Sequence, residues 1–240
     1  MSDPVDQTPY QATAAIGYGW RKFKASPSTL LVPMIVVFVG LVVAALFIQF
    51  VVAGGFFGEK SCETGQLNGE VSVDCGQSFW RQLLGAGLGA SILSLIAQVL
   101  AAGLYRGATR VTDGEDFSLG MLFEGFSKFH VVVASIFIAI ATGIATVMCF
   151  LPGVLIAFLT SYTLFFIVDQ QLEAAEAIQA SVKFVWHNFG HTLLYFILAA
   201  IVLAIGALLC GVGLLVAGPV VLIGFAYTYR RLQGEPVTPA

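Results

Sequence analysis

Residues with catalytic or metal-binding side chains are few in this sequence of 240 residues. Of its three histidines, His187 and His191 are four positions apart, a spacing that puts two rings on one face of an uninterrupted helix. A metal site would need further ligands, and the Asn-Phe-Gly between these histidines is able to break the helix. The His-Glu-x-x-His motif of metalloproteases is absent. We therefore expect no catalytic residue, no metal site and no cofactor.

Polar side chains within the long apolar segments form a second group of candidates. Gln98, Ser161 and Thr163 lie in such segments, and Asp169 lies at the end of one. An ionisable residue in mid-membrane is costly and usually functional, yet none lies near the centre of a segment. Proton-coupled transport and intramembrane hydrolysis are therefore disfavoured. We expect these residues to pack or cap helices; the alternative is a transport pathway, with Asp169 binding a cation or a basic partner.

The four cysteines fall into two pairs. Cys62 and Cys75 lie in a glycine- and serine-containing loop, which the charge pattern below assigns to the exported side of a membrane. Paired cysteines in that compartment usually form disulfides, so we predict a Cys62–Cys75 bridge, with two free thiols as the alternative. Cys149 and Cys210 each precede a predicted hairpin turn. We expect them to be small buried residues, and a second disulfide between them is the alternative.

The composition of the chain excludes several classes of protein. Hydrophobic residues make up 58% of the sequence and charged residues 10%, and the mean hydropathy is +0.90. Average soluble domains are roughly 25% charged. So few charges could not cover the surface of a soluble enzyme, and the high apolar content excludes a disordered chain. A net charge of −3 also argues against nucleic-acid binding, which requires a basic face.

Four long apolar segments indicate membrane-spanning helices, which need about 20 apolar residues each. The segments are about Leu30–Val52, Leu83–Tyr105, Val131–Val168 and Thr192–Tyr229. The last two are too long for one helix, and we expect Leu151-Pro152-Gly153 and Gly211-Val212-Gly213 to divide them into tight hairpins. The runs are continuous rather than alternating, which favours helices over a β-barrel. The predicted fold is all-α, with six transmembrane helices arranged as three hairpins.

Basic residues indicate how the six helices are oriented. Nine of the eleven Lys and Arg residues fall on one side of a six-helix topology, and only Lys60 and Arg81 fall on the other. Cytoplasmic loops carry the excess of Lys and Arg, so both termini are predicted to be cytoplasmic. A polar segment precedes the first apolar run, which is too long for a cleavable signal peptide. We interpret it as an uncleaved signal anchor.

A short amphipathic segment precedes each hairpin on the cytoplasmic side. Their apolar residues are Ile16, Trp20 and Phe23; then Leu119, Leu122, Phe123, Phe126 and Phe129; then Leu172, Ala175, Ile178, Val182, Val185 and Phe189. Such helices either lie in the headgroup plane or pack on the ends of the bundle. Residues 1–240 are therefore interpreted as one membrane domain of three repeats, about 10–110 with an extracytoplasmic loop at 54–80, 117–170 and 171–231.

Gly85 and Gly89 form a Gly-x-x-x-Gly motif in the second apolar segment. The motif lets another helix approach closely, and it supports tight packing within the bundle or dimerisation equally.

Several stretches of the sequence, taken together, resemble one known family. They are Tyr18-Gly-Trp20-Arg-Lys-Phe23, Cys149-Phe-Leu-Pro152-Gly153, Ala177-Ile-Gln-Ala-Ser181-Val-Lys-Phe and the segment from Gly218-Pro219 to Gly234. This combination resembles bacterial, especially actinobacterial, six-helix integral membrane proteins of unknown function. That family is similar to the membrane domain attached to some glycerophosphodiester phosphodiesterases. The resemblance implies an inner-membrane location and an accessory role, and it transfers no active-site residue.

Two functions remain after these exclusions. The first is a non-enzymatic membrane protein that contacts membrane lipids and assembles with itself or with an envelope complex. The second is a transporter or channel for a lipid, a peptide or another weakly polar solute. The absence of a charged centre favours the first, and the repeats are compatible with the second.

Overall fold

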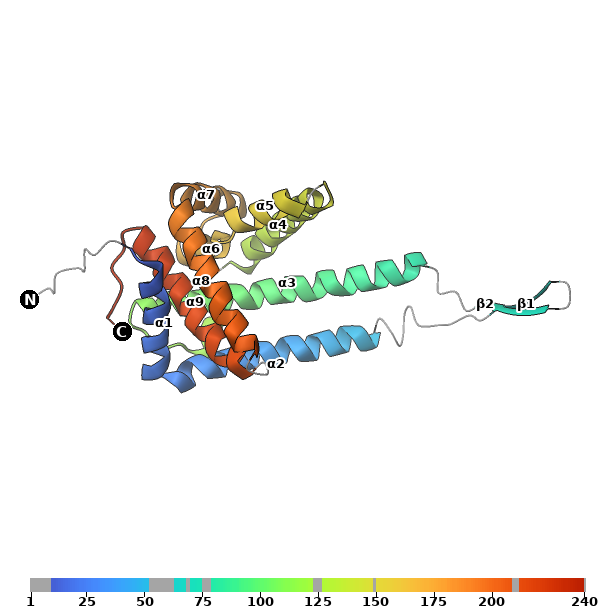
Figure 1. The fold of residues 1–240 in the computed structure, drawn as a ribbon, viewed down its shortest axis with the longest axis horizontal. Helices are drawn as coiled ribbons and strands as arrows, with labels where there is room; N and C mark the ends of the chain where they lie inside the picture. The colour runs from blue at the N-terminus through green and yellow to red at the C-terminus, as the bar shows by residue number, and fades with distance from the viewer. Residues whose placement is uncertain are drawn as a thin grey trace, which may run out of the picture. The chain divides into compact units, whose positions relative to one another are not determined.

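The computed structural model describes residues 10–51, 63–67, 70–74, 79–122, 127–148, 150–208 and 212–239. The chain divides into two compact units, which are described separately. Unit 1 comprises residues 1–37 and 98–240, and unit 2 comprises residues 38–97. Two long helices, α2 (Pro27–Val51) and α3 (Phe79–Thr112), each contribute residues to both units (Figure 1).

Unit 2 contains a short β-hairpin that the all-α prediction lacks. Strands β1 (Glu63–Leu67) and β2 (Glu70–Asp74) pair antiparallel, with Glu63 opposite Asp74 and Leu67 opposite Glu70. Val71 and Val73 are β-branched and alternate along β2, which favours a strand. The hairpin lies within the predicted loop 54–80, and the rest of the described fold is helical.

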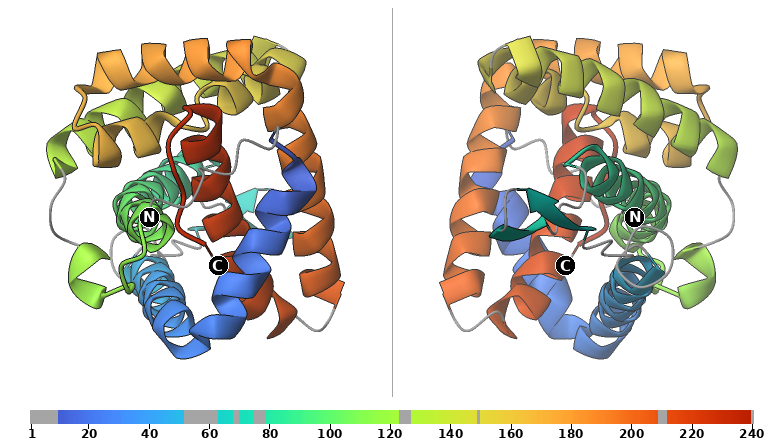
Figure 2. Two further views of the ribbon diagram at one scale, coloured as in Figure 1. Left: turned by 90° about the vertical axis from the view of Figure 1, so that its left-hand side faces the viewer. Right: turned by 90° about the vertical axis from the view of Figure 1, so that its right-hand side faces the viewer.

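Unit 1 holds the other helices of the described chain. They are α1 (Ala12–Ala25), the 3-10 turn η2 (Leu119–Leu122), α4 (Lys128–Met148), α5 (Phe150–Leu159), α6 (Thr163–Asp169), α7 (Ala174–His187), α8 (Phe189–Leu208) and α9 (Val212–Leu232). Helix α1 packs against α9 and α8, which also pack against each other, and α7 packs on α4, α5 and α6 (Figure 2).

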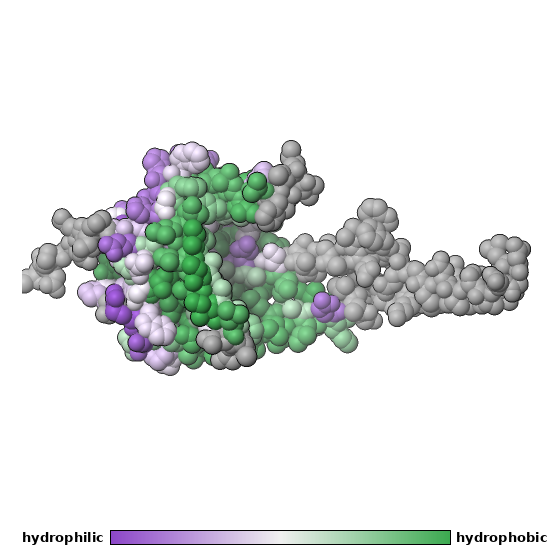
Figure 3. All heavy atoms as spheres, viewed as in Figure 1, coloured by the Kyte–Doolittle hydropathy of each residue, from purple (hydrophilic) through white to green (hydrophobic). Residues whose placement is uncertain are grey.

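Among the described residues, five helical segments are long and apolar enough to cross a membrane, and the third of these segments comprises α5, α6 and the turn between them. They are Pro27–Phe50, Ile92–Thr112, Leu151–Asp169, Phe189–Leu208 and Gly213–Leu232, and a shorter apolar helix covers Lys128–Thr142. Many large apolar side chains of α8 are exposed, and hydrophobic residues cover this helix in Figure 3. Apolar surface of this extent requires lipid rather than water around it. The chain is therefore a multi-pass membrane protein.

The apolar stretch 131–168 divides within a few residues of the predicted Leu151-Pro152-Gly153 and again at a second place. Helix α4 ends at Met148 and α5 begins at Phe150, so Pro152 and Gly153 lie in the first turn of α5. Proline is tolerated there because the first-turn N–H groups have no partner within the helix. A second interruption, which was not predicted, separates α5 from α6 at residues 160–162.

Helix α1 buries Phe23 of the predicted Ile16, Trp20 and Phe23 face, and it also packs through small residues that the prediction did not include. Trp20 is 44% exposed, whereas Gly19 is buried against α9. A methyl group at Gly19 would overlap the Val220 carbonyl. The two backbones therefore approach closely at this crossing, as small residues permit between membrane helices.

The other two amphipathic segments also differ from the prediction. Helix α7 buries Ala174, Ala177, Ser181 and Val185, while Ala175 and Phe189 of the predicted face are exposed. In the middle segment, Leu119–Leu122 forms a 3-10 turn in place of an amphipathic helix. Leu122 is buried, but Leu119 and Phe129 are exposed; Phe123 and Phe126 lie outside the described residues.

Candidate functional site at the ends of α3, α6 and α9

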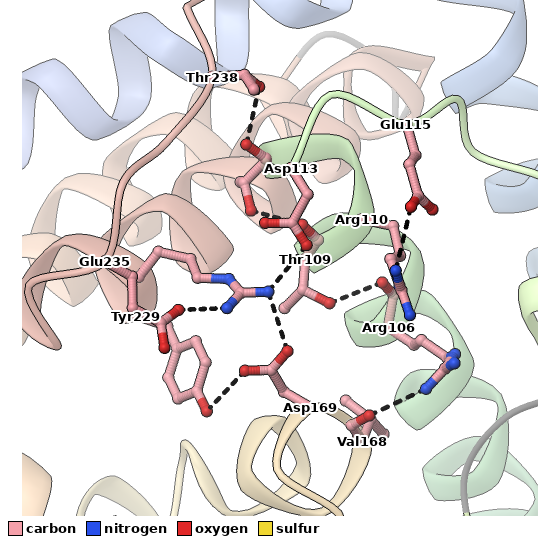
Figure 4. Close-up of polar contacts among 12 residues, drawn as sticks. Arg106, Thr109, Arg110, Asp113, Glu115, Val168, Asp169, Tyr229, Glu235 and Thr238 are labelled. Atoms are coloured by element: carbon pink, nitrogen blue, oxygen red, sulfur yellow. Dashed lines mark hydrogen bonds and ion pairs between the residues drawn. The ribbon is translucent and has the colours of Figure 1, made fainter. Parts of the chain in front are cut away.

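Arg230, in the last turn of α9, contacts carboxylates from three separate segments (Figure 4). Its Nη2 lies 2.9 Å from Asp113 Oδ2 and 3.0 Å from Asp169 Oδ1, and its Nη1 pairs with Glu235. Asp113 follows α3, Asp169 ends α6 and Glu235 follows α9. We call these four residues the Arg230 cluster.

The Arg230 cluster is largely withdrawn from solvent. The side chains of Arg230 and Asp169 are 14% and 15% exposed, while Asp113 and Glu235 are about one third exposed. Three carboxylates against one guanidinium leave a formal charge of −2. Each carboxylate is therefore attracted by Arg230 and repelled by the other two, and removing the arginine leaves three acids facing one another.

Two equivalent turns hold Arg230 and Asp113 in place. An Arg-x-x-x-Gly-Glu sequence occurs at 110–115 and again at 230–235. In each copy the glycine has a positive φ, +95° at Gly114 and +79° at Gly234, and the glutamate N–H donates to the arginine carbonyl at 3.0 Å. In each copy the arginine side chain also pairs with the glutamate. Both helices thus end in the left-handed turn that glycine favours.

Neighbouring hydrogen bonds extend the cluster. The Tyr229 hydroxyl donates to Asp169 Oδ2 at 3.3 Å, and Gln170 Nε2 donates to the Tyr229 hydroxyl at 3.3 Å. The same Gln170 amide donates to Gln233 Oε1 at 2.9 Å. The end of α6 is therefore tied to the end of α9 by several polar contacts.

Hydrogen bonds of Thr238 connect the C-terminal segment to α3 and α1. Its N–H and its hydroxyl both donate to the Thr112 carbonyl, at 3.0 and 2.8 Å. The Tyr18 hydroxyl donates to the Thr238 carbonyl at 3.0 Å. Burial raises the pKa of Tyr18 to about 12, so the phenol remains protonated and able to donate at neutral pH.

A residue of α7 forms hydrogen bonds with the free backbone groups at the interruption between α5 and α6. The Ser181 hydroxyl donates to the Leu159 carbonyl at 2.9 Å and accepts from the Tyr162 N–H at 3.2 Å. Both backbone groups would otherwise lose their helical partners. The hydroxyls of Ser161 and Thr163 are buried beside this interruption, and they make no hydrogen bond within the described part of the chain.

The structure does not gather the four predicted pathway residues into one site. Ser161 and Thr163 lie at the α5–α6 interruption, and Asp169 lies about 9 Å further along α6, in the Arg230 cluster. Gln98 is half-buried on α3, eight residues before Arg106. The distance along the helix between Gln98 and Arg106 is therefore about 12 Å.

The sequence does not predict the partners of Asp169. In the charge pattern, Arg230 is only one of the basic residues that indicate the orientation of the chain. One signal for their contact is present in the sequence: both residues lie at the end of an apolar segment, on the same predicted side of the membrane.

The other predicted site residues lie apart from this cluster. Cys62, Cys75, Cys149 and Cys210 are outside the described residues, so both predicted disulfides remain predictions. Gly85 and Gly89 are in the part of α3 that belongs to unit 2. His187 Nδ1 lies 2.7 Å from the Lys183 carbonyl, and the His191 ring packs against Tyr10.

Fold and cluster together define a helical multi-pass membrane protein whose helix ends are joined by partly buried ion pairs. No family model matches the chain, and no solved structure matches it. It is similar to the uncharacterized protein Rv2560 of Mycobacterium tuberculosis and the uncharacterized protein Mb2590 of Mycobacterium bovis. Each is 27% identical over 229 residues, which cover 94% of this chain and 70% of the relative. The similarity therefore extends over nearly all of the described helices.

Proposed function

We propose that the protein is a non-enzymatic membrane protein that acts as an assembly or accessory partner of an envelope complex and contacts membrane lipids. The observation that carries this proposal is the use of the charged groups in the Arg230 cluster. Arg230 is shared by Asp113, Asp169 and Glu235, so these groups join segments of the chain to one another. This use of charge is typical of a structural element rather than of a reactive site.

The proposed topology has six spans in three hairpins, with both termini in the cytoplasm. The shorter apolar helix in α4 would supply the sixth span, and its packing against α5 supports a hairpin there. Hydrophilic residues gather at the end of unit 1 that carries α1 and the C-terminal segment (Figure 3). The excess of basic residues supports a cytoplasmic location for this end. The resemblance to the membrane domain attached to glycerophosphodiester phosphodiesterases supports a bacterial inner membrane.

Co-purification from native membranes tests the assembly proposal. A G85L/G89L variant should lose a co-purifying protein or self-association, because leucine would prevent close helix approach at the Gly-x-x-x-Gly motif. The matched control is Gly40→Leu in α2, since a side chain at Gly40 would meet nothing within 4 Å. Mass spectrometry of proteins retained in mild detergent provides the measurement. If no protein is retained and the wild type does not self-associate, the assembly proposal is wrong.

The α5–α6 interruption favours a second candidate, a transporter or channel for a weakly polar solute. Interrupted helices form the binding sites of many transporters. The buried hydroxyls of Ser161 and Thr163 would contact such a solute.

Solute flux into reconstituted vesicles separates the two functions. If the protein is a transporter, Thr163→Val should lower flux of a permeant solute while the protein keeps its thermal stability, because valine preserves shape and removes only the hydroxyl. Thr192→Val, at another buried threonine, is the control. Absence of flux in wild-type vesicles would reject the second candidate.

A further inference from the structure

A groove in unit 1 lies between the end of α1, the start of α2 and the loop that follows α3. Its walls come from residues 22–30 and 111–117, all of which belong to unit 1. Its volume is about 100 Å³. One water molecule needs only ~10–15 Å³ measured in this way, so the groove has room for a small polar group.

The two walls of the groove carry opposite charges. Lys22 lines it from the last turn of α1, and Ser26 lines it at the junction with α2. Glu115 and Asp116 line it from the loop after α3. Glu115 pairs with Arg110 at 3.1 Å. Within the described residues, neither Lys22 nor Asp116 forms an ion pair, so each remains available to a ligand.

We propose that this groove binds the headgroup of an aminophospholipid such as phosphatidylethanolamine. The phosphodiester would accept hydrogen bonds from the Lys22 ammonium and the Ser26 hydroxyl, and the lipid ammonium would donate to the Asp116 carboxylate. A choline headgroup has no N–H to donate, and a glycerol headgroup has no cation. The inference rests on the proposed function, since it names the lipid class that the membrane protein holds.

The place of the groove along the chain favours a lipid over a soluble ligand. The first candidate span begins at Pro27, so the groove is at the level of the headgroups. On α1, Lys24 Nζ lies 5.1 Å from the ring centre of the exposed Trp20, a pairing suited to the membrane interface. Val32 and Val36 are exposed on the following turns of α2 and offer apolar surface to acyl chains.

Lipid retention by the full-length protein tests this proposal. The protein is placed in nanodiscs containing equal amounts of phosphatidylethanolamine, phosphatidylglycerol and phosphatidylcholine, released into mild detergent and examined by native mass spectrometry. Wild type should retain phosphatidylethanolamine preferentially. Asp116→Asn should reduce that preference by roughly fivefold, the scale of a partly exposed charge pair. Lys22→Gln should lower the retention of all three lipids by a similar factor, because each carries the phosphodiester, and Lys22→Arg should keep most of the retention. Lys24→Gln and Glu173→Gln, which remove charges outside the groove, should leave both the retention and the preference unchanged.

Equal retention of the three lipids by wild type, an undiminished preference in Asp116→Asn, or undiminished retention in Lys22→Gln would overturn the proposal. Displacement of the retained lipid by soluble phosphoethanolamine at modest excess would also overturn it, because the groove would then serve a soluble ligand. The proposed function is measured separately, since co-purifying proteins are counted in the G85L/G89L comparison. A loss of lipid preference with intact co-purification would reject only the headgroup site.

Discussion

Replacing Arg230 with leucine should lower the free energy of unfolding in detergent by about 3 kcal/mol, the lower end of the cost of breaking a buried ion pair, because Asp169 is largely buried but Asp113 and Glu235 are about one third exposed. Asp113, Asp169 and Glu235 would then face one another with no guanidinium between them. Arg110→Gln is the matched control, because the Arg110–Glu115 pair has the same turn geometry but is 42% and 51% exposed. Its loss should cost at most about 1 kcal/mol.

A double-mutant cycle separates this electrostatic effect from lost packing. Asp169→Asn should destabilise the wild-type protein, because it removes a partner of Arg230 at 3.0 Å. In the Arg230→Leu background the same change should restore stability, because one of three mutually repelling carboxylates is neutralised. Reversible unfolding in detergent with increasing SDS provides both values. Equal effects of Asp169→Asn in the two backgrounds would contradict the role assigned to the cluster.

Replacing Ser181 with alanine should destabilise the protein by about 2–4 kcal/mol, because two buried backbone groups lose their partner at once. These groups are the Leu159 carbonyl and the Tyr162 N–H at the α5–α6 interruption. Ser135→Ala is the control. The Ser135 hydroxyl is also buried, but it donates at 2.7 Å to the Val131 carbonyl of its own helix. That carbonyl keeps its helical hydrogen bond when the hydroxyl is removed.

Measurement of the midpoint of thermal aggregation in detergent provides a rapid comparison of the two serine variants. Ser181→Ala should lower the midpoint clearly, and Ser135→Ala should change it little. Similar midpoints for the two variants would show that the α7 hydroxyl does not stabilise the interruption.

The membrane class of the fold follows from the sequence because lipid imposes a strong compositional requirement. A chain with 58% hydrophobic and 10% charged residues has no other suitable solvent, and segments of about 20 residues mark its spans. The division between α8 and α9 lies within a few residues of the predicted Gly211-Val212-Gly213, since α8 ends at Leu208 and α9 begins at Val212.

The buried faces of α1 and α7 agree only in part with the predicted ones, since Phe23 and Val185 are buried as predicted. The predicted faces consist mainly of large apolar side chains, whereas these helices also contact the bundle through small residues such as Gly19, Ala177 and Ser181. In lipid, a large apolar side chain gains little by moving from the bilayer to a helix interface. Close approach of the backbones decides which face is buried.

The α5–α6 interruption and the Arg230 cluster were beyond local sequence reasoning. Residues 160–162 contain neither glycine nor proline, so no local signal marks the interruption, which is stabilised by Ser181 from α7. Asp113 and Arg230 are 117 positions apart in the chain. Their contact depends on the packing of the helices, although the repeated Arg-x-x-x-Gly-Glu turn is visible in the sequence.

The proposed topology has the Arg230 cluster on the cytoplasmic side of the membrane and residues 63–74 on the other side. Cysteine labelling in intact cells tests it most directly, with Glu70→Cys and Pro239→Cys introduced singly into a chain whose four native cysteines have been replaced by serine. A membrane-impermeant maleimide should label position 70 in intact cells and position 239 only after the membrane is permeabilised. Labelling of position 239 in intact cells, or protection of position 70, would contradict the account.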